Sequence, residues 1–285
     1  MSVISTTTLP PKTPMCDYSF ARPILGALRG AGIRGVIRYI SYSTNGKNLT
    51  APERDALHAA GLGILLVWEN LKGDPLSGAA LGKDHGAEAA HQATVLGYPK
   101  GLPIYAAVDM DTLNGVQTIQ IVAYLGEFAK QVQAAGFKCG GYIGSRLWWA
   151  ARGVFDADPI RPAASSWSPA SIMWSPAIRQ GNTAVIGGGA VDMDWTTTNV
   201  DVWLPRQIPD PPAPGQPLPK TVRQGDRSLV TALVQNRLNV HGYHVQVDGI
   251  FGLQTKAAVI AFQKAHRLVA DGGVGPQTWP VLLAA

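Results

Sequence analysis

The chain has 285 residues, of which 46% are hydrophobic and 15% charged, a balance typical of globular rather than disordered proteins. No apolar stretch approaches the roughly 20 residues that a membrane-spanning helix needs, so we expect no membrane partner. The net charge of +5 is uneven, because residues 1–204 carry 16 basic and 15 acidic side chains whereas residues 205–285 carry 8 and 4. The basic C-terminal part favours an anionic polymer as partner, and the lack of basic runs interleaved with aromatic residues argues against nucleic acid.

The first 204 residues alternate short apolar runs with helical patterns. We predict helices over residues 23–31, 50–60, 87–96, 114–135 and 146–151, and strands over 15–19, 35–41, 63–68, 104–109, 139–143, 163–167, 177–180 and 190–195. This alternation implies parallel pairing, and eight strands in about 200 residues indicate an α/β fold, a closed (β/α)₈ barrel. The alternative is an open doubly wound sheet, but no Gly-x-Gly-x-x-Gly follows the first strand.

Two of the predicted helices carry specific signals. Thr50 with Glu53 three residues later forms a capping box at the start of the helix over 50–60. In the helix over 114–135, apolar residues recur every three or four positions, which predicts one buried stripe. Its members are Val116, Ile119, Val122, Leu125, Phe128 and Val132.

Acidic side chains follow several of the predicted strands. The apolar run 104–108 ends in two acids that lie two residues apart and therefore on one face of a strand. Of the two acids in the eighth strand, Asp194 lies nearer the end than Asp192. Because the carboxyl ends of parallel barrel strands meet at one mouth, we expect five acids to converge there: Asp17, Glu69, Asp109, Asp111 and Asp194.

Clustered carboxylates suit general acid–base chemistry, because one can hold a proton while its neighbour is ionised. For Asp109 and Asp111 the alternative is a salt-bridged or helix-capping pair; for Asp17 it is a strand-end cap, and for Glu69 a salt bridge. Cys16 and Cys139 lie in or beside apolar strands, which predicts two buried thiols. The sequence contains no Cys-x-x-Cys and no His-Glu-x-x-His, so we predict neither a metal nor a cofactor.

Residues 205–220 contain seven prolines, which predicts a semi-rigid linker between two domains. A second, small domain follows over residues 221–285. Helical patterns at 229–238 and 255–266 flank an Asp-Gly turn at Asp248, and a second such turn lies at Asp271.

This C-terminal domain resembles the type 1 peptidoglycan-binding domain, an all-α module of three helices. The resemblance rests on Val234-Gln235-x-x-Leu238, residues 247–252, Ala258-Val259-x-x-Phe262-Gln263 and residues 271–279. Leu238, Phe262 and Trp279 fit a core. The resemblance implies peptidoglycan as ligand, and it makes Tyr243 and Asp248 candidate contacts near the turns.

Residues 15–204 resemble the glycoside-hydrolase-like domain of wall-associated proteins of actinobacteria and their phages, a distant relative of the family 25 lysozymes. The resemblance rests on residues 16–19, 105–111 and 191–195. It implies a peptidoglycan hydrolase of the muramidase type, in which the acids act on the glycan and the aromatic side chains Trp68, Tyr142 and Trp195 stack on sugar rings. Family 25 lysozymes carry Asp-x-Glu on the fourth strand, whereas this chain has Asp111 in the second position, one methylene shorter.

The combined resemblance is to an endolysin of an actinobacteriophage. The first 14 residues lack the basic-then-apolar pattern of a signal peptide, so we expect the protein to stay in the host cytoplasm until release and then to act at the cell wall, as a monomer. The alternative from another class is a catalytically inactive glycan-binding protein of the wall or the virion.

Overall fold

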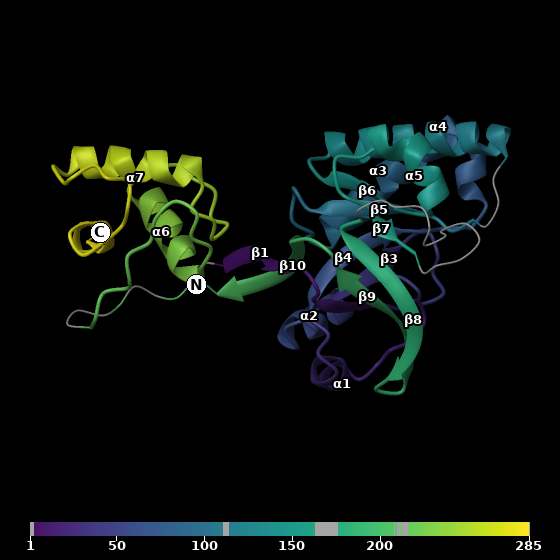
Figure 1. Cartoon of the computed structure of the whole chain (residues 1–285), viewed down its shortest axis with the longest axis horizontal. Coiled ribbons are helices and arrows are strands. Elements are labelled where there is room, and N and C mark those ends of the chain that lie inside the picture. The colour runs from purple at the N-terminus through teal and green to yellow at the C-terminus, as the bar shows by residue number, and fades with distance from the viewer. Residues whose placement is uncertain are drawn as a thin grey trace. The chain divides into compact units, whose positions relative to one another are not determined.

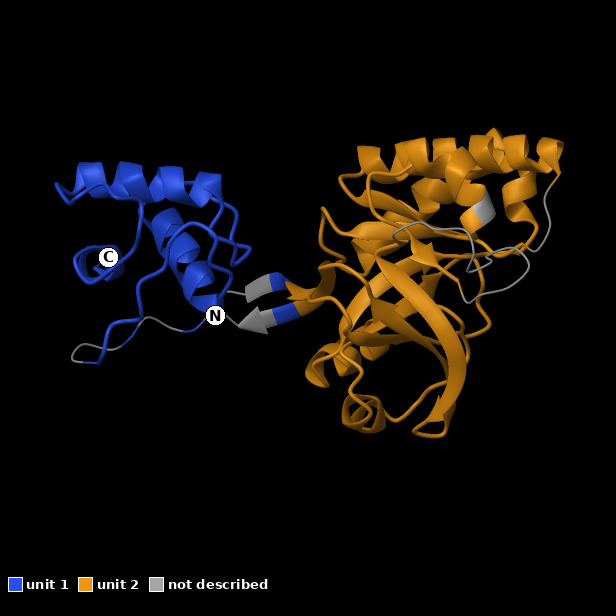
Figure 2. Ribbon diagram, in the orientation of Figure 1, with its two compact units in different colours: residues 1–6, 205–285 blue, residues 7–204 orange. Residues whose placement is uncertain are grey.

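The computed structural model describes residues 3–110, 114–162, 176–207, 209, 212 and 216–284 (Figure 1). The chain divides into two compact units (Figure 2): residues 7–204 form one, and residues 1–6 with 205–285 form the other. Among the helices of the described residues, none combines the length and the apolar character needed to cross a bilayer.

The larger unit is a closed eight-stranded barrel, as the sequence predicts. Hydrogen bonds join its strands in the order β4-β3-β2-β9-β8-β7-β6-β5, and pairing of β5 with β4 closes the ring. All neighbours are parallel except β9, which runs antiparallel to β2 and to β8. The barrel strands are β2 (Pro14–Asp17), β3 (Gly35–Ile40), β4 (Gly63–Trp68), β5 (Pro103–Val108), β6 (Lys138–Ile143), β7 (Ile160–Arg161), β8 (Ile178–Ile186) and β9 (Gly189–Thr196).

The reversal of β9 is a correction to the all-parallel barrel expected from the alternation. The chain turns directly from β8 into β9 at Gly187 and Gly188, whose φ angles of 58° and 80° lie in the left-handed region that favours glycine. A two-residue turn leaves no room for a crossover helix, so the two strands must pair antiparallel. The predicted sixth strand, 163–167, lies outside the described residues; the sixth strand of the ring is β7, just before it.

Two further strands were not predicted. β1 (Val3–Leu9) and β10 (Val200–Gln207) are neighbours in the sheet, and β10 pairs antiparallel with the start of β4, Trp203 opposite Ile64. β10 runs to Gln207, three residues into the segment expected to be linker.

In the described residues of this unit, five α-helices accompany the barrel: α1 (Leu25–Gly30), α2 (Ala51–Ala59), α3 (Ala79–Val95), α4 (Gly115–Ala134) and α5 (Ser145–Ala151). In Figure 1, α3, α4 and α5 lie together along one flank. The helices α3 and α4 approach closely because α3 places glycines at the contact. A Cβ on Gly82 would lie 2.1 Å from the backbone oxygen of Tyr124, and one on Gly86 would lie 2.5 Å from that of Phe128.

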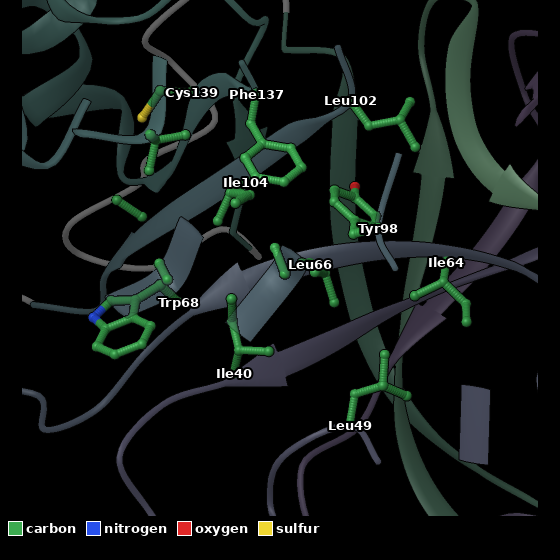
Figure 3. Packing of buried hydrophobic residues seen from close by; sticks show 14 of the residues in the cluster. Ile40, Leu49, Ile64, Leu66, Trp68, Tyr98, Leu102, Ile104, Phe137 and Cys139 are labelled. Atoms are coloured by element: carbon green, nitrogen blue, oxygen red, sulfur yellow. The ribbon is translucent and has the colours of Figure 1, made fainter. Parts of the chain in front are cut away.

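The main hydrophobic core lies between the strands and these helices (Figure 3). Strand residues alternate between this outer layer and the barrel interior. In β4, for example, Ile64, Leu66 and Trp68 face the outer layer, whereas Leu65 and Val67 belong to the interior cluster. Both cysteines are free and buried, as predicted.

The predicted stripe of α4 is only partly right. Leu125, Phe128 and Val132 are buried, but Val116 and Ile119 are 68% and 72% exposed. Steps of three residues fall 60° short of a full turn, so the line through Val116, Ile119 and Val122 drifts around the helix instead of staying on one face. The buried face is Ile121, Tyr124, Leu125, Phe128, Ala129 and Val132.

The cap of α2 is also partly as predicted. The Thr50 hydroxyl accepts a hydrogen bond from the Glu53 N–H at 3.4 Å. The Glu53 carboxylate, which a capping box would turn back to the helix start, instead pairs with the fully buried guanidinium of Arg38 at 2.8 Å. The buried cation takes this carboxylate because an unpaired charge in the core is costly.

The C-terminal domain has the three helices that its resemblance implies: α6 (Leu229–Val240), α7 (Leu253–Ala265) and α8 (Thr278–Leu283). Leu238, Phe262 and Trp279 are fully buried in its core. Two buried glutamines, Gln235 and Gln263, each hold one of the two Asp-Gly turns, and each donates to an aspartate and a threonine.

Candidate active site at the barrel mouth

A chain of hydrogen bonds joins four inward-facing polar side chains at the carboxyl ends of the strands. Asp17, at the end of β2, accepts at Oδ1 from the Tyr39 hydroxyl (3.0 Å) and at Oδ2 from Gln180 Nε2 (2.7 Å). The Tyr142 hydroxyl donates to Gln180 Oε1 at 3.0 Å. Four different strands, β2, β3, β6 and β8, therefore meet at this one point.

Strand alternation explains why these side chains meet. Met15, Ile37 and Ile178 belong to the interior cluster, so the residues two positions later, Asp17, Tyr39 and Gln180, face inward as well. Asp17 and Tyr142 were predicted from the sequence as site residues, whereas Tyr39 and Gln180 were not. The signal for both was present, since each lies two residues after an inward-facing isoleucine of its strand.

The two acids of β9 join this group in an order that corrects the prediction. Because β9 is antiparallel to β2, Asp192 lies opposite Asp17, and Asp194 lies two pairs deeper, opposite Met15. The carboxyl end of β9 thus lies at the far end of the barrel, so Asp192, and not Asp194, is nearer the mouth. Asp194 is nevertheless fully buried, and its other neighbour across the strands is Gln180.

Burial and nearby negative charges raise the pKa values of Asp17 and Asp194. The pKa of Asp17 is raised to about 7, mainly by burial and also by the charge of Asp192, while the hydrogen bonds from Gln180 and Tyr39 oppose the rise. Burial also raises the pKa of Asp194 well above its ordinary value, and the charges of Asp17 and Asp192 add to this. Within the part of the chain that the structure describes, neither oxygen of Asp194 has a hydrogen-bond partner.

Two more of the predicted acids lie at the rim, each beside a lysine. Glu69 pairs with Lys47 Nζ at 3.2 Å, and Asp109 pairs with Lys72 Nζ at 3.6 Å. The Asp109 side chain is 43% exposed, in contrast to Asp17 at 5%. Burial is the main cause that raises the pKa of Tyr142, and the charges of Asp17, Asp109 and Asp194 raise it further. These three acids therefore all act on the same side chain. Asp111 lies outside the described residues.

Of the three aromatic residues predicted to contact sugars, only Tyr142 lies in the site. Trp68 is 1% exposed and packs in the outer core, because it and Glu69 are consecutive and so point to opposite faces of the strand. Trp195 is paired with Pro14, at the amino end of β2, and its ring lies against Gly181. Neither tryptophan can stack on a ligand at the mouth.

A different surface offers stacking area beside the site. Phe20 and Tyr42 are 58% and 50% exposed, and the Tyr42 ring packs edge-on against Trp68, with 5.3 Å between the ring centroids. Together with Ser43, Asn45, Lys47, Asn70 and Leu71 they line a hollow of about 370 Å³, which we call the Tyr42 hollow. Lys47 belongs both to this hollow and to the ion pair with Glu69, so the hollow adjoins the rim of the mouth.

A cavity of about 480 Å³ lies at the opposite end of the barrel. Pro103 and Lys138, the first residues of β5 and β6, line it. It contains none of the acids at the mouth. Functional groups of such barrels lie at the carboxyl ends of the strands, so we assign the site to the mouth and not to this cavity.

In the C-terminal domain, the two predicted contact residues have structural partners. Tyr243 packs its ring on Phe262, with 5.9 Å between the ring centroids. Asp248 accepts from Gln235 Nε2 at 2.7 Å and from the Ile250 N–H at 2.8 Å, which fixes the turn. Among the described residues, no group of three or more His, Cys, Asp or Glu side chains is arranged to hold a metal ion.

Comparisons with known proteins agree with this architecture. The family described as "Rv2525c-like, glycoside hydrolase-like domain" matches residues 26–201, and the one described as "Putative peptidoglycan binding domain" matches residues 230–282. The chain is 31% identical over 120 residues to the "Putative peptidoglycan hydrolase Rv2525c" of Mycobacterium tuberculosis (strain ATCC 25618 / H37Rv). That match takes 39% of this chain and 50% of the relative, so the chain spans about half the length of the curated relative it matches.

Solved structures show the same fold. The crystal structure of the Mycobacterium tuberculosis Tat-secreted protein Rv2525c with L-tartrate has a TM-score of 0.57 at 25% identity, covering 65% of this chain and 95% of that one. The complex of the same protein with HEPES gives 0.58 at 24% identity, covering 65% and 96%. Because the barrel family matches more than half of the chain, the protein belongs to the Rv2525c-like, glycoside hydrolase-like domain family and carries a C-terminal peptidoglycan-binding domain.

Proposed function

We propose that this protein hydrolyses the glycan strands of peptidoglycan at the barrel mouth, while its C-terminal domain holds it on the cell wall. The observation that carries the proposal is a group of acids at the barrel mouth: Asp17, which is held by Tyr39 and Gln180, the fully buried Asp194, and the half-buried Asp192 opposite Asp17. Burying like charges together is costly, and such sites are enriched in catalytic acids. The family and the name of the mycobacterial relative supply the substrate class, the glycan of peptidoglycan.

Glycoside hydrolysis needs one carboxyl that carries a proton and one that is ionised. Asp17, with its pKa raised to about 7, suits the donor, because it still holds a proton near neutral pH and can release it to the leaving oxygen. The hydrogen bonds from Tyr39 and Gln180 fix its orientation. Asp109, exposed at the rim beside Lys72, suits the ionised carboxyl that faces the developing positive charge of the sugar.

The substrate would approach across the Tyr42 hollow. Aromatic rings stack on the apolar faces of sugars, and the side-chain amides of Asn45 and Asn70 can bond hydroxyl and N-acetyl groups. The hollow thus takes the role that the sequence assigned to Trp68 and Trp195. We further propose that the protein acts at the wall in the manner of a phage lysin, with its C-terminal domain raising the local concentration of substrate.

The test is an assay on purified bacterial walls that counts the chemical groups released. Wild type should produce new reducing ends, the product of glycosidic cleavage, and no new amino groups. Asp17→Asn, Asp109→Asn and Asp111→Asn should each lower this rate, whereas Asp55→Asn, an exposed acid on α2, should not. New amino groups without reducing ends would assign a different bond, and equal rates in all variants would remove the proposed site.

A second function, a catalytically inactive glycan-binding barrel, is favoured by one observation. Both rim acids, Glu69 and Asp109, are paired with lysines, which lowers their availability to a substrate. Such a protein would sediment with walls but release no reducing ends at any pH between 5 and 8.

A further inference from the structure

The C-terminal domain contains a cleft that nothing in its resemblance assigns. Its walls are the segment before α6, represented by Arg223 and Gln224, the helix α7 at Lys256, and the second Asp-Gly turn. Its volume is about 380 Å³, and we call it the Arg223–Lys256 cleft. The residues that line it are Thr221, Arg223, Gln224, Lys256, Asp271, Gly272 and Gly273.

The base of the cleft is built by fixed backbone. Val222 and Val274 exchange two backbone hydrogen bonds, of 3.1 and 2.8 Å, which tie one wall to the turn. The buried side chain of Gln263 accepts from the Gly272 N–H at 2.9 Å and donates to Asp271 Oδ1 at 2.8 Å. The cleft is therefore formed before any ligand binds, which avoids an ordering cost on binding.

Glycine is required where the turn meets α7. Gly272 has a φ of 74°, and a Cβ there would lie 3.0 Å from Cγ of Lys256 and 3.1 Å from Ile260. The absence of a side chain lets the stem of Lys256 lie against the turn. Its ammonium then reaches Gln224 Oε1 at 3.2 Å and is held at the cleft.

Neither cation of the cleft forms a close ion pair, although the charge of Arg223 contributes to lowering the pKa of Asp271. Among the described residues, neither Arg223 nor Lys256 lies within 4.0 Å of a carboxylate oxygen. The acid in the cleft, Asp271, uses Oδ1 to accept from Gln263 and from the Gly273 N–H, the latter being the main reason that its pKa is lowered. Asp226, three residues after Arg223, accepts a hydrogen bond from the Arg223 backbone N–H. The cleft therefore keeps one net positive charge.

We propose that the Arg223–Lys256 cleft binds a free carboxylate of the peptide part of peptidoglycan, and not its glycan. A guanidinium and an ammonium facing one hollow suit a single carboxylate, since Arg presents two parallel N–H donors and Lys adds a third. The glycan strand itself offers mainly neutral hydroxyl and amide groups. Gln224 and Thr221 can bond the adjoining peptide groups.

A polymer of phosphate groups is the less suitable occupant. Such a chain needs a row of cations, whereas the remaining basic side chains of the described part of this domain lie outside the cleft. Arg237, for example, donates to the carbonyls of Leu282 and Leu283. The one net positive charge of the Arg223–Lys256 cleft fits one anionic group at a time.

This inference rests on the wall-binding half of the proposed function, and the experiment separates the two. Full-length protein carrying Asp17→Asn, which keeps the wall intact during the assay, is mixed with purified walls and sedimented. The comparison is between this protein, the same protein with Arg223→Ala and Lys256→Ala, and a matched control with Arg227→Ala and Lys264→Ala. The control removes two cations from the same segment and the same helix but outside the cleft.

We expect the cleft variant to bind walls at least about ten-fold more weakly, and the control to bind within about two-fold of the parent. Because Arg223 is exposed and Lys256 is not in the core, we expect the cleft variant to keep the thermal transition of the parent. An unchanged transition shows that the loss of binding is not caused by unfolding. If the parent does not sediment with walls at all, the wall-binding function fails. If the parent sediments and the cleft variant sediments equally well, the inference about the cleft fails.

The source of the anion is tested on treated walls. Converting the peptide carboxylates of the walls to neutral amides with a carbodiimide and ammonia should reduce binding of the parent to the level of the cleft variant, whereas stripping phosphate polymers should leave it unchanged. The opposite pattern, binding lost with the phosphate polymers and kept when the carboxylates are blocked, would overturn the assignment to a carboxylate.

Discussion

The barrel mouth and the C-terminal domain use their aspartates in opposite ways. In the barrel, Asp17 and Asp194 are buried near other acids, and their pKa values are raised. In the C-terminal domain, Asp226, Asp248 and Asp271 each accept a backbone N–H, at 2.8, 2.8 and 2.9 Å. An aspartate that accepts backbone N–H groups stabilises a turn, whereas a buried one beside like charges destabilises the fold.

The difference teaches where function can be sought. Acids that destabilise a fold need another reason to be present, so the barrel acids are candidates for chemistry. In the C-terminal domain the acids are committed to structure, and the uncompensated groups are the cations Arg223 and Lys256. A search for function by residue type alone would select Asp248, which the structure places in a turn.

The largest expected effect concerns the proton on Asp17. We expect Asp17→Asn to lower the release of reducing ends from walls by about 10²–10⁴-fold, because the amide cannot donate the proton that a general acid supplies. In wild type, the rate should fall as pH rises through about 7, where Asp17 loses its proton. A pH series of both proteins measures this, and an Asp17→Asn rate within three-fold of wild type would contradict the role of donor.

The structural half of the comparison is tested at the two glutamines. Gln235→Ala leaves the Asp248 and Gly249 N–H groups without the acceptor that holds them in the turn. We expect a loss of about 2–4 kcal/mol in the free energy of unfolding of this domain, and a similar loss for Gln263→Ala. Denaturant titration measures it, with Gln254→Ala, an exposed position on α7, as control. A loss below about 1 kcal/mol would mean that these turns are held by something else.

For the barrel acids we expect the opposite effect, in which a substitution raises the free energy of unfolding. Because the pKa of Asp194 is raised in the folded state, the native protein keeps a proton that the unfolded chain loses above its ordinary value of 3.8. The stability of the fold that depends on protonated Asp194 is therefore fully present in acid, and it is lost as the pH rises through the folded-state pKa of Asp194. Asp194→Asn removes this loss, so we expect it to stabilise the barrel by about 1–3 kcal/mol at pH 8 and by almost nothing at pH 4.

Thermal unfolding of the barrel at both pH values, followed by near-ultraviolet circular dichroism, measures this effect. Asp55→Asn, in an exposed ion pair with Arg54, should change the transition little at either pH value. Destabilisation by Asp194→Asn at pH 8 would show that the carboxylate is stabilised in a way that its buried, unpartnered oxygens do not indicate.

The periodicity of the sequence predicted most of the barrel, because strands buried on both faces read as short apolar runs. The direction of β9 could not be read from its own residues, since a strand has the same alternation in either direction. The signal lay in the turn before it, where Gly187 and Gly188 both adopt positive φ. Two adjacent glycines between apolar runs favour a hairpin over a crossover, and this alone would have placed Asp192, not Asp194, beside Asp17.

The choice of site residues failed where it considered how far along a strand a residue lies but not which face of the strand its side chain occupies. Trp68 and Glu69 were both assigned to the mouth, yet consecutive strand residues face opposite sides, and only one of them can be there. Tyr39 and Gln180 were missed because neither is acidic, although their parity matched that of Asp17. The Tyr42 hollow could not be predicted, because it depends on loops whose conformation has no sequence period.

The smallest expected effect tests whether substrate reaches the barrel acids by way of this hollow. Tyr42→Ala should weaken the use of wall substrate about three- to ten-fold, the value of one aromatic contact, with a higher KM and little change in kcat. Trp195→Phe is the matched control, since Trp195 is an aromatic residue predicted from the sequence to bind sugar but placed by the structure at the other end of the strand. If Trp195→Phe raised KM and Tyr42→Ala did not, the glycan would not pass over the hollow, and the exposed ring of Tyr42 would need another partner.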